Sequence, residues 1–144
     1  MHNNNFVPFS RKAFYYETDA MGIVHHSNYI RWMEEARINW LSNIGYPYAE
    51  IECQGLMIPV LSAECQYKYP VKYDDEFEIK IILREFNCVR FSVEYNIFNK
   101  TTNKLSAVGK TSHCFVNKDF RPVRTKRDYP ELYNIFNNNL NTEF

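Results

Sequence analysis

Three segments between residues 61 and 97 alternate apolar and polar residues with a period of two. Their apolar positions are Leu61, Ala63, Cys65, Tyr67 and Tyr69; Phe77, Ile79, Ile81 and Leu83; and Val89, Phe91, Val93, Tyr95 and Ile97. Because successive side chains of a β-strand point to opposite faces, each segment is predicted to be a half-buried strand. Residues 73–76, 86–88 and 99–104 are too few for crossover helices, so consecutive strands, including a last one near residues 105–117, must be antiparallel.

The strongest helix signal lies upstream of these strands, over residues 29–44, where apolar residues recur at steps of three or four. The residues on this face are Tyr29, Trp32, Met33, Ala36, Trp40 and Ile44. Such spacing stacks side chains along one side of a helix. Ser27 or Asn28 is a suitable N-cap, and Gly45 can close the last turn in a left-handed conformation. Two charge pairs are expected on the polar side, Arg31 with Glu35 and Glu34 with Arg37.

The order of these elements defines the expected fold. A strand within residues 6–16 and a loop over residues 17–28 precede the long helix, and a shorter helix near residues 48–54 precedes the four later strands. Residues 129–140 are predicted to form a terminal helix. The simplest closure lays the long helix across the concave face of a five-stranded twisted sheet, which is an α+β domain of two layers. Without a repeat or linker, residues 1–144 are expected to form one domain.

The aromatic content points to an assembly. Phe, Trp and Tyr make up 17% of the chain. This is more than a small monomer buries easily, and aromatic residues are enriched in the buried centres of interfaces. We therefore expect a homo-oligomer.

The composition excludes several classes of function. The chain carries 17 basic and 17 acidic residues, so its zero net charge gives nucleic acid no reason to bind. No apolar run approaches the roughly 18 to 20 residues that span a bilayer, and residues 1–5 lack the pattern of a signal peptide. We expect a cytoplasmic protein without a membrane partner. The four cysteines include no C-x-x-C pair and no i, i+4 histidine pair exists, so neither a metal nor a cofactor is expected.

The densest group of reactive side chains lies in residues 19–29, just before the long helix. This loop contains Asp19, Gly22, His25 and His26. The free N–H groups at a helix start stabilise developing negative charge, and a nearby carboxylate can act as a nucleophile or general base. A plainer interpretation has Asp19 capping a turn, both histidines at the surface, and Gly22 serving only a positive φ.

The residues from this loop into the helix, residues 15–37, form the motif Y-x-E-T-D-A-x-G-I-V-H-H-S-N-Y-x-x-W-M-E-x-A-R. It resembles the signature of hotdog-fold acyl-CoA thioesterases of the 4-hydroxybenzoyl-CoA thioesterase family. The resemblance continues through residues 58–60, 73–75, 107–111 and 121–122. It implies a hotdog fold, a five-stranded antiparallel sheet wrapped around one long helix. It also implies homodimers joined edge to edge, often paired into homotetramers, with active sites at the dimer interface.

The resemblance also implies roles for individual residues. Asp19 takes the place of the catalytic carboxylate, which attacks the thioester carbonyl or activates a water, and His26 positions that water or holds the acyl carbonyl. Backbone N–H groups of residues 22–26 and of the adjoining helix turn are the expected oxyanion donors. The implied substrate-binding residues are Gly22, Val24, His25, Tyr29, Glu34, Met57, Pro59 and Arg90, where Arg90 would meet the phosphates of coenzyme A. Lys110 and Arg121 are further basic candidates, and Glu34 has an alternative role in a surface pair with Arg37.

We therefore expect a thioester hydrolase that cleaves acyl-CoA, or an acyl-carrier-protein ester, to a free acid and a thiol. Two alternatives stay open. One is a hotdog protein that binds acyl thioesters without efficient turnover, and the other is a hotdog dehydratase or hydratase. The intact Asp19 and Gly22 favour hydrolysis.

Overall fold

The computed structural model describes residues 6–144. Residues 1–5, on which the expectation about a signal peptide rests, lie outside the described residues. The elements are, in order, β1 (Phe9–Lys12), η1 (Tyr15–Glu17, a 3-10 turn), α1 (Ser27–Asn43), α2 (Tyr48–Cys53), β2 (Val60–Tyr67), β3 (Glu76–Phe86), β4 (Arg90–Asn99), β5 (Lys104–Cys114), α3 (Thr125–Asp128) and α4 (Pro130–Asn138). No helix within residues 6–144 is long and apolar enough to cross a membrane.

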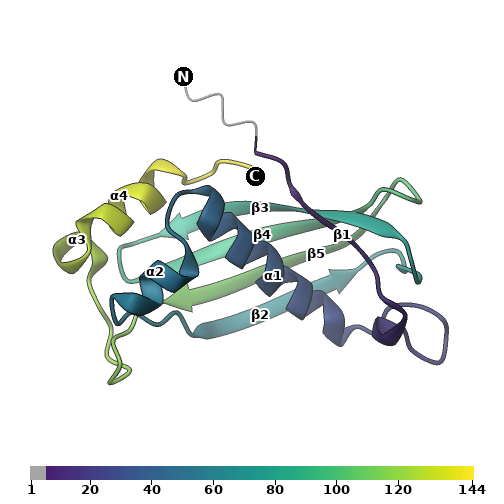
Figure 1. Cartoon of the computed structure of the whole chain (residues 1–144), viewed down its shortest axis with the longest axis horizontal. Coiled ribbons are helices and arrows are strands. Elements are labelled where there is room, and N and C mark those ends of the chain that lie inside the picture. The colour runs from purple at the N-terminus through teal and green to yellow at the C-terminus, as the bar shows by residue number, and fades with distance from the viewer. Residues whose placement is uncertain (1–5) are drawn as a thin grey trace.

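The sheet has five antiparallel strands in the order β1-β3-β4-β5-β2. Helix α1 lies across one face of this sheet, and α3 and α4 lie at one end of the molecule (Figure 1). The α+β class and the hotdog arrangement predicted from the sequence are therefore confirmed. The first strand is shorter than predicted, because the chain turns into η1 after Ala13.

The apolar face of α1 forms the core together with the concave face of the sheet. Trp32, Met33, Ala36 and Trp40 are buried, and the ring of Trp32 stacks on Phe77 with centroids 4.1 Å apart. Gly109 of β5 allows α1 to approach closely, since a β-carbon there would lie 2.1 Å from Cε of Met33. The packing of interior side chains leaves no space for such an atom.

The ends of α1 differ in part from the prediction. Gly45 has a φ of +91° and ends the helix as expected. At the start, however, Ser27 and Asn28 are inside the helix, and Nδ1 of His25 accepts the N–H of Ser27 at 3.2 Å. The predicted pair of Arg31 with Glu35 is absent from the described part of the chain, because Glu35 binds Arg11 of β1 at 2.7 Å.

The two edges of the sheet are very different. The outer edge of β3 is covered by β1 along one half, and along the other half by the C-terminal tail, where Phe144 and Ile81 exchange two backbone hydrogen bonds of 2.9 Å. The edge formed by β2 has no such cover within residues 6–144. Almost all of β2 is exposed on both faces, so the prediction of a half-buried strand is wrong for a single chain. Open edges of this kind are available for pairing with another strand.

Candidate active site

The loop between η1 and α1 is a tight hairpin. The N–H of Asp19 donates to the carbonyl of Ile23 at 2.8 Å, and the N–H of Gly22 donates back to the carbonyl of Asp19 at 3.0 Å. Gly22 adopts a φ of +79°, which glycine reaches without steric cost. The N–H of Val24 also binds the carbonyl of Val71 at 2.7 Å, so the loop is fixed to the segment that follows β2.

Asp19 has two carboxylate oxygens in different environments. Its Oδ1 accepts the N–H of Met21 at 2.8 Å, as the turn-capping interpretation requires. Its Oδ2 accepts no hydrogen bond from any residue that the structure describes. The half-buried side chain lines a cavity of about 340 Å³ together with Met21, Ile23, Val24, His26, Tyr29, Tyr67, Lys68, Tyr69 and Pro70. One oxygen therefore holds the turn while the other is available for chemistry.

The two histidines have separate roles. Both are exposed, and their rings are 4.1 Å apart. His25 uses Nδ1 as an acceptor for the backbone of Ser27 and also contacts Oγ of Ser27 at 2.8 Å, so it caps α1. His26 lines the Asp19 cavity, and its carbonyl accepts the hydroxyl of Tyr67 at 3.1 Å. Only His26 is placed to meet a molecule in this cavity.

Most of the backbone N–H groups proposed as oxyanion donors are already bonded. The N–H groups of Gly22 and Val24 are bonded within the loop or to Val71, and that of His25 donates to the carbonyl of Glu17 at 2.8 Å. For Ile23 and His26, no acceptor lies among residues 6–144. His26 immediately precedes α1, where the helix dipole favours negative charge. Ile23 and His26 are therefore the candidate oxyanion donors whose N–H groups remain unbonded within residues 6–144.

Tyrosine rings form the inner wall of the cavity. Tyr29 is 3% exposed and packs edge-to-face on Tyr67 with centroids 5.0 Å apart. Burial raises the pKa of Tyr29 to about 12, so its hydroxyl stays protonated at neutral pH. Tyr29 therefore lines the cavity with a neutral hydroxyl.

A buried carboxylate that the sequence interpretation missed supports this loop. Glu17 is 5% exposed and its Oε1 accepts Arg11 at 2.6 Å and the N–H of Phe14 at 2.8 Å. Its Oε2 accepts Nε1 of Trp32 at 2.7 Å. The available signal was an acidic residue two positions before Asp19 in the motif, opposite a tryptophan on the apolar face of the helix.

The remaining predicted substrate-binding residues lie toward the other end of the molecule. Glu34 lines a second cavity of about 150 Å³ with Arg37, Ile38, Leu41, Tyr48, Ile58, Val60 and Phe91. The backbone of Met57 pairs with Val116, and Pro59 directly precedes β2. Lys110 lies on β5 in a hollow with Glu64 and Glu94, and Arg121 is exposed in the turn after β5.

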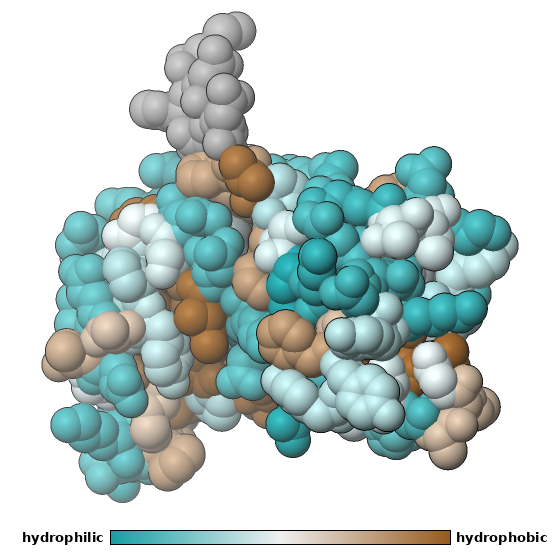
Figure 2. Space-filling view, turned by 45° about the vertical axis from the view of Figure 1, so that its right-hand side comes forward, coloured by the Kyte–Doolittle hydropathy of each residue, from teal (hydrophilic) through white to brown (hydrophobic). Residues whose placement is uncertain are grey.

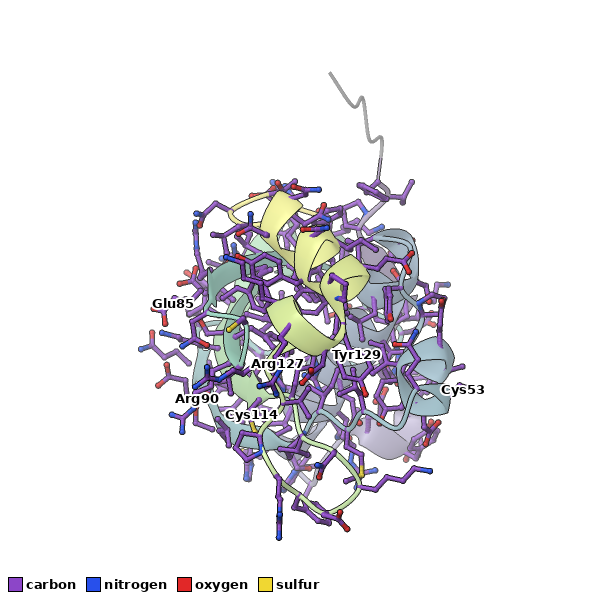
Figure 3. All side chains as sticks on the ribbon, turned by 90° about the vertical axis from the view of Figure 1, so that its left-hand side faces the viewer. Cys53, Glu85, Arg90, Cys114, Arg127 and Tyr129 are labelled. Atoms are coloured by element: carbon purple, nitrogen blue, oxygen red, sulfur yellow. The ribbon has the colours of Figure 1, made fainter. Side chains whose placement is uncertain are left out.

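Arg90 is far from Asp19 in one chain. It begins β4, opposite Cys114, whereas Ile97 and Ala107 continue the row that reaches Tyr67 at the Asp19 cavity. The strand advances seven residue steps from Arg90 to Ile97, which span about 23 Å at about 3.3 Å per step. Figure 3 shows Arg90 on the same side as Glu85 and Cys114, at the end opposite the loop after η1 in Figure 1. A single chain therefore does not bring Arg90 to Asp19.

Metal-ligating side chains are not clustered in the described residues. No group of three or more His, Cys, Asp and Glu within residues 6–144 is arranged to hold a metal ion. The four cysteines are free thiols. The residues that line the Asp19 cavity present a carboxylate, an imidazole, the ammonium of Lys68 and the hydroxyls of three tyrosines.

A curved sheet around one long helix, with a carboxylate and open N–H groups at the start of that helix, defines a protein of the hotdog thioesterase class. The chain belongs to the Thioesterase-like superfamily, whose family model matches residues 15–131. The chain is similar to a Bacillus subtilis protein whose name assigns it as an acyl-CoA thioesterase, YneP, with 31% identity over 85% of this chain and 88% of the relative. An Aquifex aeolicus protein assigned by name as an esterase is 43% identical over 75% of this chain and 83% of its own length.

A solved structure shows the same fold. The DHNA-CoA thioesterase of Staphylococcus aureus superposes with a TM-score of 0.86 and 31% identity, over 90% of this chain and 87% of that chain. The resemblance to hotdog thioesterases that the motif predicted is confirmed at the level of this superfamily.

Proposed function

We propose that the protein hydrolyses acyl-CoA thioesters to a free acid and coenzyme A, with Asp19 as its catalytic carboxylate. The observation that carries this proposal is that Asp19, whose Oδ2 is free, lines the same cavity as His26, whose backbone N–H has no acceptor among the described residues. The names of the similar proteins from Bacillus subtilis and Staphylococcus aureus support a coenzyme A ester as substrate. An acyl-carrier-protein ester shares the same reacting group.

The proposed reaction begins with the thioester carbonyl oxygen against the N–H of His26, with the N–H of Ile23 as a second donor. These groups stabilise the negative charge that develops on this oxygen. In one route Asp19 attacks the carbonyl carbon, the carbon–sulfur bond breaks, the thiolate takes a proton, and water hydrolyses the mixed anhydride. In the other route Asp19 takes a proton from a water that attacks the carbonyl carbon, the carbon–sulfur bond breaks, and the departing thiolate takes that proton. Label in Asp19 after a single turnover in ¹⁸O-labelled water would establish the first route, with water attacking the Asp19 carbonyl of the anhydride, because the second route adds no oxygen to Asp19.

We further propose that two copies pair through β2 and complete each other's active sites. A two-fold axis at the middle of this strand pairs the open edge with itself in antiparallel fashion. Val60 then lies opposite Tyr67 of the partner subunit. The Glu34, Pro59 and Arg90 end of one chain is thereby brought to the Asp19 cavity of the other. The exposure of β2 and the apolar patches among hydrophilic residues near the η1 end (Figure 2) support this assembly.

Free-thiol release from short, long, branched and aromatic acyl esters, by wild type and Asp19→Asn together, tests the function. The substitution keeps size but removes the nucleophile or base, so turnover is expected to fall at least about a hundredfold. The melting temperature should change little because Oδ1 can still accept the N–H of Met21. Near-normal turnover of Asp19→Asn would refute the assignment of Asp19 as the catalytic carboxylate. Acyl-carrier-protein esters in the same panel decide between the two thiol carriers.

A further inference from the structure

The side chain of Glu17 is bonded to three separate parts of the molecule. Its oxygens accept Arg11 of β1, the N–H of Phe14 before η1, and Nε1 of Trp32 in α1, at 2.6, 2.8 and 2.7 Å respectively. The guanidinium of Arg11 also binds Glu35 at 2.7 Å and lies 4.2 Å from the ring centroid of Phe14. The carboxylate therefore fixes where η1 sits between β1 and α1.

The backbone of Glu17 continues this connection into the Asp19 loop. Its carbonyl accepts the N–H of His25 at 2.8 Å and Nδ2 of Asn28 at 2.8 Å. These two bonds flank His26, whose N–H is open. On the other side, Glu17 is separated from Asp19 by Thr18 alone, which forms a bridge with Val24. The placement of Glu17 thus determines the positions of both the Asp19 side chain and the N–H of His26.

Stability alone is a weak reason for a charged group at this position. The side chains of Arg11 and Glu17 are only 14% and 6% exposed. Replacing a buried ion pair with apolar side chains of similar size is often neutral or stabilising, because desolvation offsets the attraction. A directional set of hydrogen bonds, in contrast, holds a segment in one geometry. The hydrogen bonds that Arg11, Phe14 and Trp32 donate to Glu17 therefore serve to orient η1 and the loop that follows it.

We propose that Glu17 is a positioning residue, which aims the carboxylate of Asp19 and the N–H of His26 at the same thioester carbonyl. This proposal rests on the hydrolase function proposed above. A displacement of about 1 Å at a reacting group costs up to about a hundredfold in rate. The effect should fall on kcat, since Glu17 itself does not line the cavity that receives the substrate.

The two tryptophans of α1 provide a matched pair of variants. Trp32 and Trp40 are both buried in the same helix, but only Trp32 donates Nε1 to Glu17, while Nε1 of Trp40 has no partner among the described residues. Trp32→Phe and Trp40→Phe therefore remove the same ring volume, and only the first removes a bond to Glu17. Trp32→Phe is expected to lower kcat about tenfold with KM changed less than twofold. Trp40→Phe should keep kcat within twofold, even with an equal loss in melting temperature.

Direct substitutions of Glu17 complete the test, with all assays run well below the melting temperature of each variant. Glu17→Gln keeps one acceptor oxygen, so its kcat should exceed that of Glu17→Ala. Amide hydrogen exchange provides a readout that does not depend on turnover. Exchange at His25 should accelerate at least about tenfold in Glu17→Gln and Trp32→Phe and stay unchanged in Trp40→Phe, while amides of β4 remain protected.

Two outcomes would overturn the proposal. One is an equal loss of kcat in both tryptophan variants, in proportion to their melting temperatures. The other is unchanged exchange at His25 in Glu17→Gln. Failure of the proposed hydrolase function is distinguishable, because it shows as no thiol release by the wild type from any ester of the panel, whereas the exchange comparison judges the positioning role by itself.

Discussion

The charged groups near the start of α1 are ion-paired, whereas a charged group further along the helix is not. Near its start, Glu17 is paired with Arg11 and accepts further hydrogen bonds from Phe14 and Trp32. Further along, the half-buried Arg37 donates to the hydroxyl of Tyr95 at 3.1 Å and forms no ion pair within the described residues. The charge of Glu17 near the start of the helix is compensated by an ion pair within one chain, and the charge of Arg37 is not.

Behind Arg37 lies a neutral chain of hydrogen bonds. The hydroxyl of Tyr95 is 2.7 Å from Oγ1 of Thr111, which is 2.8 Å from Nε2 of the buried His113. One set of donors that satisfies all these groups has Arg37 donating to Tyr95, Tyr95 to Thr111, and Thr111 to Nε2 of His113. None of the three residues in this row of hydrogen bonds, Tyr95, Thr111 and His113, brings a negative charge to Arg37.

This contrast distinguishes the end of α1 whose charges are paired within one chain from the end whose charge lacks a partner in one chain. The compensated end carries the Asp19 loop, whose geometry is fixed by contacts of this chain alone. The uncompensated end borders the 150 Å³ cavity at the open β2 side of the sheet. A half-buried cation without a partner keeps part of its desolvation cost, so this end favours completion by an acidic group of another copy or of a ligand.

Removing the cation at each end should therefore have unequal consequences for stability. Arg11→Met leaves the carboxylate of Glu17 buried and unpaired, which is expected to cost about 3–5 kcal/mol in free energy of unfolding. Arg37→Met leaves no buried charge and removes one donor from Tyr95, so its cost should be about 1 kcal/mol. Urea unfolding of the two variants measures the difference. Equal costs would show that Arg37 has a carboxylate partner in the folded protein.

The acid sensitivity of the second end provides another measurement. Burial, and then the charge of Arg37, lower the pKa of His113 to about 3, while the carbonyl of Pro59 acts in the opposite direction. The unfolded chain binds this proton near pH 6.5 and the folded chain near pH 3, so stability is present above pH 6.5 and is lost as pH falls through this window. Between pH 7 and 4.5 the loss should be about 2–3 kcal/mol.

His113→Gln keeps an acceptor for Thr111 but cannot take up this proton. Urea unfolding of wild type and variant at both pH values should show a smaller fall in the free energy of unfolding for the variant. Equal falls would mean that His113 is already protonated in the folded protein.

The sequence predicted the repetitive parts of the molecule well. α1, β3 and β4 lie within a few residues of the predicted segments, because periods of 3.6 and 2 report directly which face is buried. The same logic failed for β2, whose alternation predicts a buried face that one chain does not provide. The alternation there reports a partner that a single chain lacks, if the proposed pairing is correct.

The candidate site was predictable only where its residues are contiguous. Asp19, Gly22 and His26 lie in one loop, so the sequence placed them together. The bond from Trp32 to Glu17 joins positions 15 residues apart through a polar contact with no period, so the acidic residue before Asp19 in the motif was its one trace in the sequence. Likewise Arg90 and Asp19 both follow from the motif resemblance, yet strand direction sends them to opposite ends of one chain.

Blocking the open edge tests whether the two ends act together. Leu61 lies exposed on β2, and a charge on an edge strand discourages pairing with another strand. Leu61→Lys is therefore expected to give a folded monomer by light scattering and to lower turnover about tenfold, equal to about 1.4 kcal/mol of barrier. Leu105→Lys, an equal change at an exposed apolar residue of β5 away from that edge, should keep the assembly and turnover. A Leu61→Lys monomer with full turnover would mean that one chain holds a complete site, and the uncompensated Arg37 would then belong to some other partner.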